Sequence, residues 1–196
     1  TDWDLRGAAY QAFHAPSMNN TLRSYGSAVG GWYLANPNLT PETMTGYELG
    51  TDYRWRGGFA QFTAFNNYIN NAITSYKITS ANAAFANSLC RASGITGCVP
   101  NVGGSGFTNV NYYTNQQNLL SRGIEIQYHH DVNSRWALDG GYSYTRTVLT
   151  WSATSDPTNT QVGGVPKNMA TAGVTYYPVP QASITTNVRY VGNSWM

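Results

Sequence analysis

The sequence has few charged residues, few cysteines and no long apolar run. Only 10% of its 196 residues are charged, against about 25% in ordinary soluble domains. Its 11 basic and 9 acidic residues are scattered, so it lacks the basic stripe of a nucleic-acid-binding protein. No stretch approaches the roughly 18 consecutive apolar residues of a membrane helix. These absences exclude a nucleic-acid partner and a helical membrane protein.

The polarity of the chain comes from glycine, tyrosine and uncharged polar residues. It contains 20 glycines and 15 tyrosines, and 14% of its residues are aromatic. Disordered chains lack aromatic residues, so this composition favours a folded protein. The chain begins at Thr1 inside a strand-like pattern, without the charged and apolar segments of a signal peptide. We therefore interpret it as a mature protein or as a segment of a longer one.

Apolar and polar residues alternate with a period of two over much of the chain, which is typical of β-strands. The clearest case is 46–55, where Tyr47 and Leu49 alternate with charged residues. One face of this strand is therefore apolar and the other is charged. A tight turn at 56–58 leads into a second alternating segment at 59–69. The two segments are predicted to form a hairpin.

Two further pairs of alternating segments are predicted to form hairpins of the same kind. One pairs 122–130 with 136–145, and the other pairs 168–177 with 182–191. A seventh strand is predicted at 3–12, and we expect its partner to lie before residue 1. The two additional turns are predicted at 131–134 and 178–181.

Long polar connections separate these hairpins, at 13–45, 70–121 and 149–167. Short turns at one end of the strands and long loops at the other are typical of outer-membrane β-barrels, whereas long structureless connections are uncommon in compact soluble domains. Tilted strands of about ten residues also suffice to cross a bilayer. The sequence therefore predicts an all-β fold: an antiparallel transmembrane β-barrel wall whose apolar side chains face lipid and whose polar side chains face a wet lumen.

Aromatic residues and glycines have expected places in such a wall. Aromatic side chains near the hairpin ends are predicted to form an interfacial girdle. Gly123, Gly140 and Gly141 fall inside strands, where we expect bulging or close approach, although ordinary strand glycine explains them equally well. Two alternatives for the fold remain: a small self-contained outer-membrane barrel or adhesin, whose first and last strands would pair, and a secreted carbohydrate-binding β-sandwich. The predicted girdle residues are Tyr53, Trp55, Phe59, Tyr128, Trp136, Tyr176, Tyr177 and Tyr190.

Several short motifs follow one another in the chain. Phe-His-Ala-Pro-Ser at 13–17 precedes Ala-Asn-Pro-Asn-Leu-Thr-Pro-Glu at 35–42 and Tyr-Glu-Leu-Gly at 47–50. Farther along come Arg-Gly-Ile-Glu at 122–125 and Gly-Tyr-Ser-Tyr-Thr at 141–145. In this order and spacing the set resembles the barrel motifs of TonB-dependent outer-membrane receptors, which usually have Phe-Arg in place of the Phe-His here. Further matching segments are 65–73, 166–167 and 188–192.

The resemblance implies a barrel of roughly 22 strands around an N-terminal plug, in the bacterial outer membrane. Residues 1–196 would supply about seven strands from the C-terminal half, as an internal fragment that lacks the plug and the C-terminal strands. The implied function is TonB-dependent uptake of a ferric siderophore or a similar metal chelate, with a cobalamin-like ligand as the alternative. TonB would act through the missing plug, and outer-membrane lipid would surround the barrel.

The sequence contains no constellation of residues that is typical of an enzyme. His14, His129 and His130 are too few and too scattered for a metal site, and the adjacent pair would point to opposite faces of one strand. There is no Gly-x-Ser-x-Gly elbow and no phosphate-binding loop. We therefore expect no catalytic residue, no metal site and no cofactor.

Ligand recognition is expected in the long connections, because loops on a rigid wall supply many binding residues. Arginine and aromatic side chains suit an anionic, aromatic-rich iron chelate through charge-assisted hydrogen bonds and stacking. The same aromatic residues can also simply pack loops together. The candidate ligand-binding residues are Arg23, Tyr25, Trp32, Tyr33, Arg91, Tyr112, Tyr113 and Gln116.

The two cysteines, Cys90 and Cys98, lie close together in the second long connection. A short disulfide loop there fits an oxidising compartment, and two free thiols are the alternative. A closed Cys90–Cys98 loop would lower the conformational entropy of a long surface loop. We therefore predict a structural role for this pair.

Overall fold

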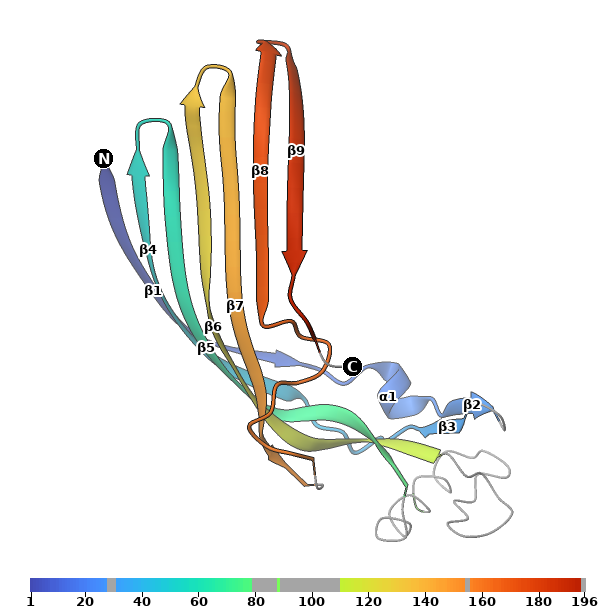
Figure 1. Cartoon of the computed structure of the whole chain (residues 1–196). Coiled ribbons are helices and arrows are strands. Elements are labelled where there is room, and N and C mark those ends of the chain that lie inside the picture. Colours follow the sequence, from blue (N-terminus) through green and yellow to red (C-terminus); the bar gives the residue numbers. More distant parts are fainter. Residues whose placement is uncertain (28–30, 79–87, 89–109, 154–155, 195–196) are drawn as a thin grey trace.

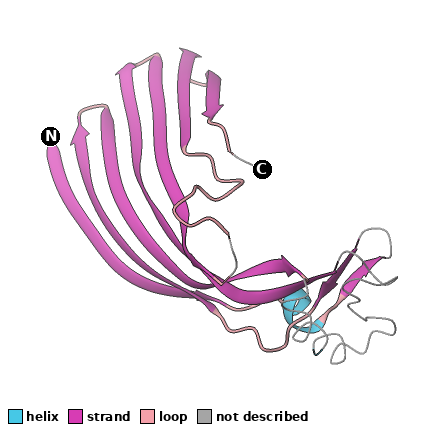
Figure 2. Cartoon of the chain, turned by 60° about the horizontal axis from the view of Figure 1, so that its bottom comes forward, coloured by secondary structure: helices cyan, strands magenta, loops and turns pink. Residues whose placement is uncertain are grey.

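The computed structural model describes residues 1–27, 31–78, 88, 110–153 and 156–194 of the chain. They form a nine-stranded sheet that curves into an open wall (Figures 1 and 2). Seven long antiparallel strands lie in the order β1-β4-β5-β6-β7-β8-β9, which confirms the predicted all-β wall. No helix in these ranges is both long and apolar enough to cross a membrane. The long strands are β1 (Asp2–His14), β4 (Glu42–Trp55), β5 (Gly58–Lys77), β6 (Val110–Asn133), β7 (Trp136–Ser152), β8 (Asn168–Val179) and β9 (Ala182–Val191).

Three tight turns join the long strands at one end of the wall, and they confirm the three predicted hairpins. They lie at Arg56–Gly57, Ser134–Arg135 and Pro180–Gln181. Gly57 has a φ of +85°, a left-handed conformation that favours glycine in a two-residue turn. The second turn begins later than predicted, because β6 continues through Asn133 with an irregular register near its end.

The strand predicted at 3–12 corresponds to β1, whose neighbour in the described sheet is β4. One edge of β1 pairs along its whole length with β4, and Trp3 lies opposite Tyr53. The 13–45 connection therefore joins two neighbouring strands of the wall. The hairpin partner predicted before residue 1 would pair with the other edge of β1, and it stays a prediction.

At the other end of the wall, the strands extend farther than the sequence predicts. β5 continues to Lys77 and β6 already begins at Val110, so much of the predicted 70–121 loop is paired strand. β3 joins this extension through parallel pairing with the start of β6. Alternation weakens here because strands that project beyond the apolar belt meet water on both faces. The shorter elements are α1 (Met18–Leu22), β2 (Tyr25–Ser27) and β3 (Gly31–Leu34).

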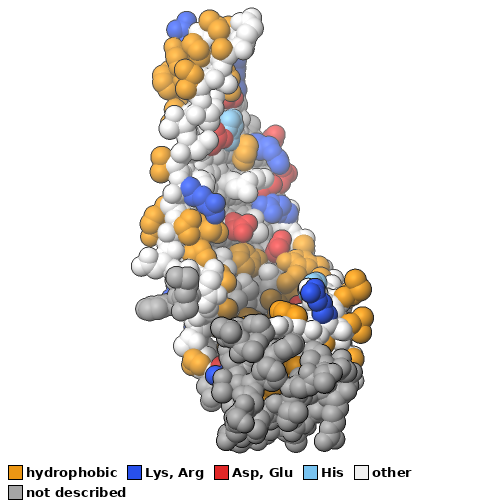
Figure 3. Space-filling view, turned by 90° about the vertical axis from the view of Figure 1, so that its right-hand side faces the viewer, with side chains coloured by type: hydrophobic (Ala, Val, Ile, Leu, Met, Phe, Trp, Pro, Cys, Tyr) orange, Lys and Arg blue, Asp and Glu red, His pale blue; other side chains and the backbone are white. Residues whose placement is uncertain are grey.

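The two faces of the wall differ as the alternation predicts. Leu5, Leu49 and Val188 project from the convex face, with exposed fractions of 86%, 68% and 66%. Figure 3 looks toward the hollow of the sheet, where acidic and basic side chains are interleaved along the middle of the view. Such exposure of the apolar face contradicts the β-sandwich alternative, which requires that face to be buried against a second sheet.

Aromatic residues pair on the convex face next to the short turns, as expected for an interfacial girdle. Phe59 is an exception among the predicted girdle residues. It lies on the concave face, where its ring stacks on His129 at a centroid distance of 5.7 Å. The other centroid distances are 4.6 Å for Trp3–Tyr53, 5.9 Å for Trp55–Tyr128 and 4.5 Å for Trp136–Tyr176.

Close approach of backbone explains Gly123. An added Cβ would lie 2.0 Å from the backbone oxygen of Tyr144 and 2.8 Å from the ring of Phe65. The register of β6 is continuous at this position, so Gly123 does not mark a bulge. At Gly140, by contrast, an added Cβ would meet nothing closer than 3.8 Å, as at an ordinary strand glycine.

Candidate ligand-binding surface

The concave face contains a ladder of polar side chains that connects β1, β4 and β5. Arg6 donates from Nε to Asp52 Oδ1 at 2.9 Å and from Nη2 to Thr63 Oγ1 at 2.8 Å. The Asp52 side chain is only 8% exposed, so it needs the arginine to compensate its charge. A Cβ at Gly50, which lies opposite Arg6, would come within 2.9 Å of the guanidinium carbon. Gly50 therefore makes room for the arginine to cross the strand.

The same arrangement recurs four residues along each strand. The Tyr10 hydroxyl donates to Glu48 Oε1 at 2.8 Å and lies 3.0 Å from Asn67 Oδ1. Its ring lies against Gly46, where an added Cβ would be 2.4 Å from the ring atoms. Two glycines of β4 thus allow side chains of β1 to reach across to β5.

Charged pairs continue the polar surface toward the short turns. Arg54 pairs with Asp4, and its Nη2 lies 3.5 Å from Asp52 Oδ2. Farther along the sheet, His129 Nδ1 lies 2.7 Å from Asp139 Oδ1. Most of the charged groups on this part of the concave face therefore have a partner of opposite charge or a polar neighbour.

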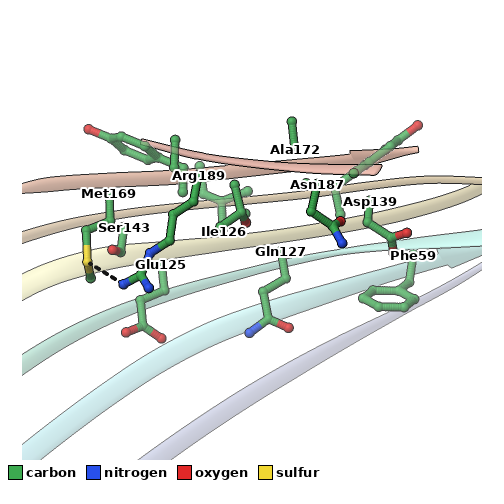
Figure 4. Close-up of a pocket in the computed structure, with 17 residues that line it drawn as sticks. Phe59, Glu125, Ile126, Gln127, Asp139, Ser143, Met169, Ala172, Asn187 and Arg189 are labelled. Atoms are coloured by element: carbon green, nitrogen blue, oxygen red, sulfur yellow. Dashed lines mark hydrogen bonds between the residues drawn. The ribbon is translucent and has the colours of Figure 1, made fainter. Parts of the chain in front are cut away.

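Two hollows lie on the concave face. The first has a volume of about 610 Å³ and is lined by β5 to β9, and Figure 4 shows Arg189 and Glu125 extending into it from different strands. The second, of about 630 Å³, adjoins the polar ladder. Glu125 and Gln127 line both hollows. The concave face thus offers a continuous surface of hydrogen-bond donors and acceptors to a polar solute.

Asparagine side chains attach the 13–45 connection to the outer ends of β5 and β6. Asn36, which is 4% exposed, donates from Nδ2 to the Tyr113 carbonyl at 2.9 Å. Asn115 accepts from the Thr40 amide at 2.9 Å and donates from Nδ2 to the carbonyls of Thr40 and Asn71, at 2.9 and 2.7 Å. We call Asn36, Asn71 and Asn115 the asparagine clasp. It fixes β3 against the start of β6.

Three tyrosines, Tyr25, Tyr33 and Tyr113, form a tyrosine cluster on this extension. The rings of Tyr25 and Tyr33 stack at 5.4 Å with 15° between their planes, and those of Tyr33 and Tyr113 lie 6.1 Å apart. The Tyr25 and Tyr113 hydroxyls are 2.9 Å apart. Burial, aided by the hydrogen bond to Tyr25, raises the pKa of Tyr113 to about 12. The Tyr113 phenol is therefore neutral at physiological pH, and Tyr25 is 38% exposed.

The structure brings three of the predicted ligand-binding residues together in the tyrosine cluster and separates the others. Arg23 is exposed and directly follows α1. The backbone of Trp32 lies in β3, opposite Val110 of β6. Arg23 and the cluster thus belong to the same extension, beyond the long strands of the wall.

Three predicted loop residues lie in β6 instead, namely Tyr112, Tyr113 and Gln116. Tyr112 is only 3% exposed, and Gln116 is half-buried with its carbonyl accepting from the Ala153 amide at 3.0 Å. The prediction of a loop is wrong here, because the segment is polar on both faces yet paired with β5. Arg91, Cys90 and Cys98 lie outside the described residues.

The histidine side chains of β6 make contacts within the sheet. In the ranges that the structure describes, no three His, Cys, Asp or Glu side chains gather where they could hold a metal ion. His129 and His130 point to opposite faces, as predicted: His129 contacts Asp139, and His130 Nδ1 accepts from Trp55 Nε1 at 3.1 Å.

The asparagine clasp was not foreseen from the sequence. The Asn-Pro-Asn motif marks the position of Asn36, but its partner is the Tyr113 carbonyl, 77 residues away. Asn115 has no local signal at all, since it lies in a polar segment of the predicted loop. Only the pairing of β3 and β5 with β6 reveals what these amides contact.

The sequence of this chain matches one family model and is similar to curated proteins. A family model described as TonB dependent receptor-like, beta-barrel matches residues 1–196. The chain is similar to the iron-regulated outer membrane virulence protein of Vibrio cholerae serotype O1, with 24% identity over 192 residues, which cover 97% of this chain and 26% of that protein. The chain thus spans about a quarter of the length of the curated relatives it matches.

Solved structures share the fold. The hemophore receptor HasR of Serratia marcescens has a TM-score of 0.68 and 15% identity, over 97% of this chain and 30% of that one. The copper transporter OprC has a TM-score of 0.65 and 15% identity, over 99% and 25%. The siderophore receptor PirA from Acinetobacter baumannii has a TM-score of 0.59 and 17% identity, over 98% and 28%. Each of these chains is more than three times as long as the segment it shares.

Proposed function

The chain belongs to the TonB-dependent receptor family, as part of its β-barrel, and we propose that it forms a section of an outer-membrane wall through which a ferric siderophore or a similar metal chelate is imported. The family is one of outer-membrane receptors and not of enzymes, and it places the chain in the bacterial outer membrane. The observation that supports import most directly is the separation of faces: the convex face is apolar, and the concave face is polar.

Capture is proposed for the extension that bears the tyrosine cluster. Neutral phenol rings stack on aromatic ligand groups, and their hydroxyls donate hydrogen bonds to oxygen ligands of a chelate. Arg23, which is exposed and two residues before β2, adds a positive charge that suits an anionic chelate. The relatives include a siderophore receptor and an iron-regulated outer membrane protein, which favours an iron chelate over the cobalamin-like alternative.

Passage is proposed along the concave face after capture. Its arginines and carboxylates are largely paired with each other, as in the Arg6–Asp52 pair, so the wall offers polar contacts without a strong net charge. Such a surface lets a hydrated solute move without being trapped. TonB is proposed as the partner that drives this step, through a plug that is not part of residues 1–196.

The self-contained barrel is the weaker alternative. It requires the first and last strands to pair, whereas β1 and β9 occupy opposite edges of the described sheet. The Cys90–Cys98 disulfide stays a prediction, with a structural role in the connection between β5 and β6.

The proposal can be tested with the full-length receptor that contains this chain. We expect Tyr25→Ala combined with Tyr113→Ala to weaken binding of the cognate ferric siderophore about tenfold, since one lost aromatic contact and one lost hydrogen bond together amount to about 1.4 kcal/mol. Tyr190→Ala is the matched control, because Tyr190 is 60% exposed on the convex face. The measurements are equilibrium binding and growth on single ferric siderophores under iron limitation.

Two results would contradict the proposal in different ways. If the double variant binds the siderophore as tightly as the wild type, the tyrosine cluster is not the capture site. If no ferric siderophore supports growth through the wild-type receptor but cobalamin uptake depends on it, the ligand class is wrong. A thermal unfolding curve for each variant separates both results from a loss of folding.

A further inference from the structure

Two arginines lie directly opposite each other on the convex face, where lipid is expected. Arg122 of β6 and Arg146 of β7 are register partners. Alternate residues of a strand share a face, so Arg122 projects with Ile124 and Arg146 projects with Tyr144. These neighbours belong to the apolar convex face and not to the polar ladder. The arginines are therefore outside the lumen.

Their height along the wall matches the outer border of the apolar belt. Arg146 lies ten residues beyond Trp136, an aromatic residue of the girdle next to the short turns. Ten residues of strand rise about 33 Å, or about 25 Å along the membrane normal at a tilt of about 40°. The apolar band of an outer-membrane barrel is also about 25 Å tall. The guanidinium groups are thus placed where the acyl chains end and the lipid head groups begin.

The pair lacks a counter-charge from the part of the chain that the structure describes. Like charges on directly opposed strand positions repel each other, and no described carboxylate lies within ion-pair distance of either group. Arg146 Nη2 donates only to the Asn159 carbonyl, at 3.1 Å, and Arg122 is exposed. Asn66 of β5, the register partner of Arg122 on its other side, adds an amide to the same row. Two cations and an amide in a row are suited to an anion.

We propose that Arg122 and Arg146 together bind a phosphate group of an outer-leaflet lipid. Guanidinium groups bind phosphate through paired, charge-assisted hydrogen bonds, and a phosphorylated lipid head group is the anion that this border of the membrane presents. The bound phosphate would relieve the repulsion between the arginines and fix the lipid against β6 and β7. This site is separate from capture and passage of the imported chelate and does not depend on which chelate is imported.

The test uses the full-length receptor in detergent micelles and native mass spectrometry with purified lipid A. We expect the wild type to retain bis-phosphorylated lipid A, and Arg122→Gln with Arg146→Gln to weaken its binding about tenfold or more, since two charge-assisted contacts are lost. Arg135→Gln is the matched control, because Arg135 is exposed in a short turn at the opposite border. Dephosphorylated lipid A should bind wild type and double variant equally weakly.

Three results would overturn the proposal. The first is unchanged binding of bis-phosphorylated lipid A by the double variant. The second is an equal loss of lipid A binding in Arg135→Gln. The third is displacement of the lipid by millimolar inorganic phosphate, which would indicate a site for free anions. Gel mobility before and after heating reports whether each variant folds. If the glutamine variant does not fold, Arg122→Lys with Arg146→Lys replaces it in the test. The lysine variant keeps the charges but not the paired hydrogen bonds. Its binding of bis-phosphorylated lipid A should be measurably weaker than that of the wild type, but by less than tenfold.

Discussion

Replacing Gly123 with alanine should destabilise the wall, whereas the same change at Gly140 should not. Both glycines lie inside long strands, and both changes add one methyl group. The methyl group at Gly123 would lie 2.0 Å from a backbone oxygen of β7, and a real Cβ essentially never approaches another atom within 3.0 Å. At Gly140 the nearest atom is 3.8 Å away. The pair therefore isolates the effect of close backbone approach from the effect of losing a strand glycine.

The expected magnitude follows from two opposing effects. Relief of the contact at Gly123 requires β6 and β7 to separate by about 1 Å, and overpacking of this kind costs about 1–3 kcal/mol. Alanine in place of glycine also restricts the unfolded chain, which stabilises the fold by about 0.4–1 kcal/mol. We therefore expect Gly123→Ala to lower the free energy of unfolding by about 1–2 kcal/mol. Gly140→Ala should leave it unchanged or raise it by up to about 1 kcal/mol.

The assay is urea unfolding of the full-length receptor in lipid vesicles, followed by tryptophan fluorescence. A second variant distinguishes the two contacts of the added methyl group: Phe65→Leu removes the ring that lies 2.8 Å away but leaves the backbone oxygen in place. Adding Phe65→Leu to Gly123→Ala should therefore not restore stability. Equal unfolding midpoints for Gly123→Ala and the wild type would refute the role of close approach, as would an equal loss for Gly140→Ala.

Three other changes probe the polar ladder, the asparagine clasp and the tyrosine cluster. Arg6→Gln should lower the free energy of unfolding by about 1–3 kcal/mol in the same urea assay, because it removes the closer of the two cations of the buried Asp52 carboxylate and leaves only Arg54, at 3.5 Å. Asn115→Ala should speed hydrogen exchange at the Thr40 amide at least tenfold, as it removes the acceptor 2.9 Å away; unchanged exchange would contradict the clasp. The raised pKa of Tyr113 means that its contribution to stability is complete below about pH 10, the ordinary tyrosine value, and is lost as the pH rises through about 12. An absorbance titration at alkaline pH should therefore lose one tyrosinate step near pH 12 in Tyr113→Phe.

The sequence predicts the wall well because each long strand shows its own two faces. The alternation at 46–55 places Tyr47 and Leu49 on one side and Glu48 on the other, and the structure exposes the first two on the convex face. A single strand is enough to show this pattern. The tight turn that follows the strand is also visible in a short stretch of sequence. Pairing across a long connection is different, because the 13–45 connection has no local signal to show that β1 and β4 are neighbours.

The candidate site is only partly predictable because its contacts join distant segments. The sequence identifies Tyr25, Tyr33 and Tyr113 as aromatic residues of long connections, but not that their rings meet. That contact depends on the parallel pairing of β3 with β6, which no local pattern encodes. The same holds for Asn115, whose amide bridges two segments. Arg122 was likewise visible only as part of a family motif.

The family motifs encode the construction of the wall rather than the choice of ligand. In the Tyr-Glu-x-Gly segment, Glu48 accepts from Tyr10, and Gly50 makes room for Arg6. Ser17 of the Ala-Pro-Ser motif caps α1, and Asn36 of the Asn-Pro-Asn motif holds β3 in place through a backbone carbonyl. Each of these groups makes a contact within the chain that helps to hold the wall together. Two receptors can therefore share these structural contacts and still differ at other side chains that line the hollows, such as Arg189 and Asn187.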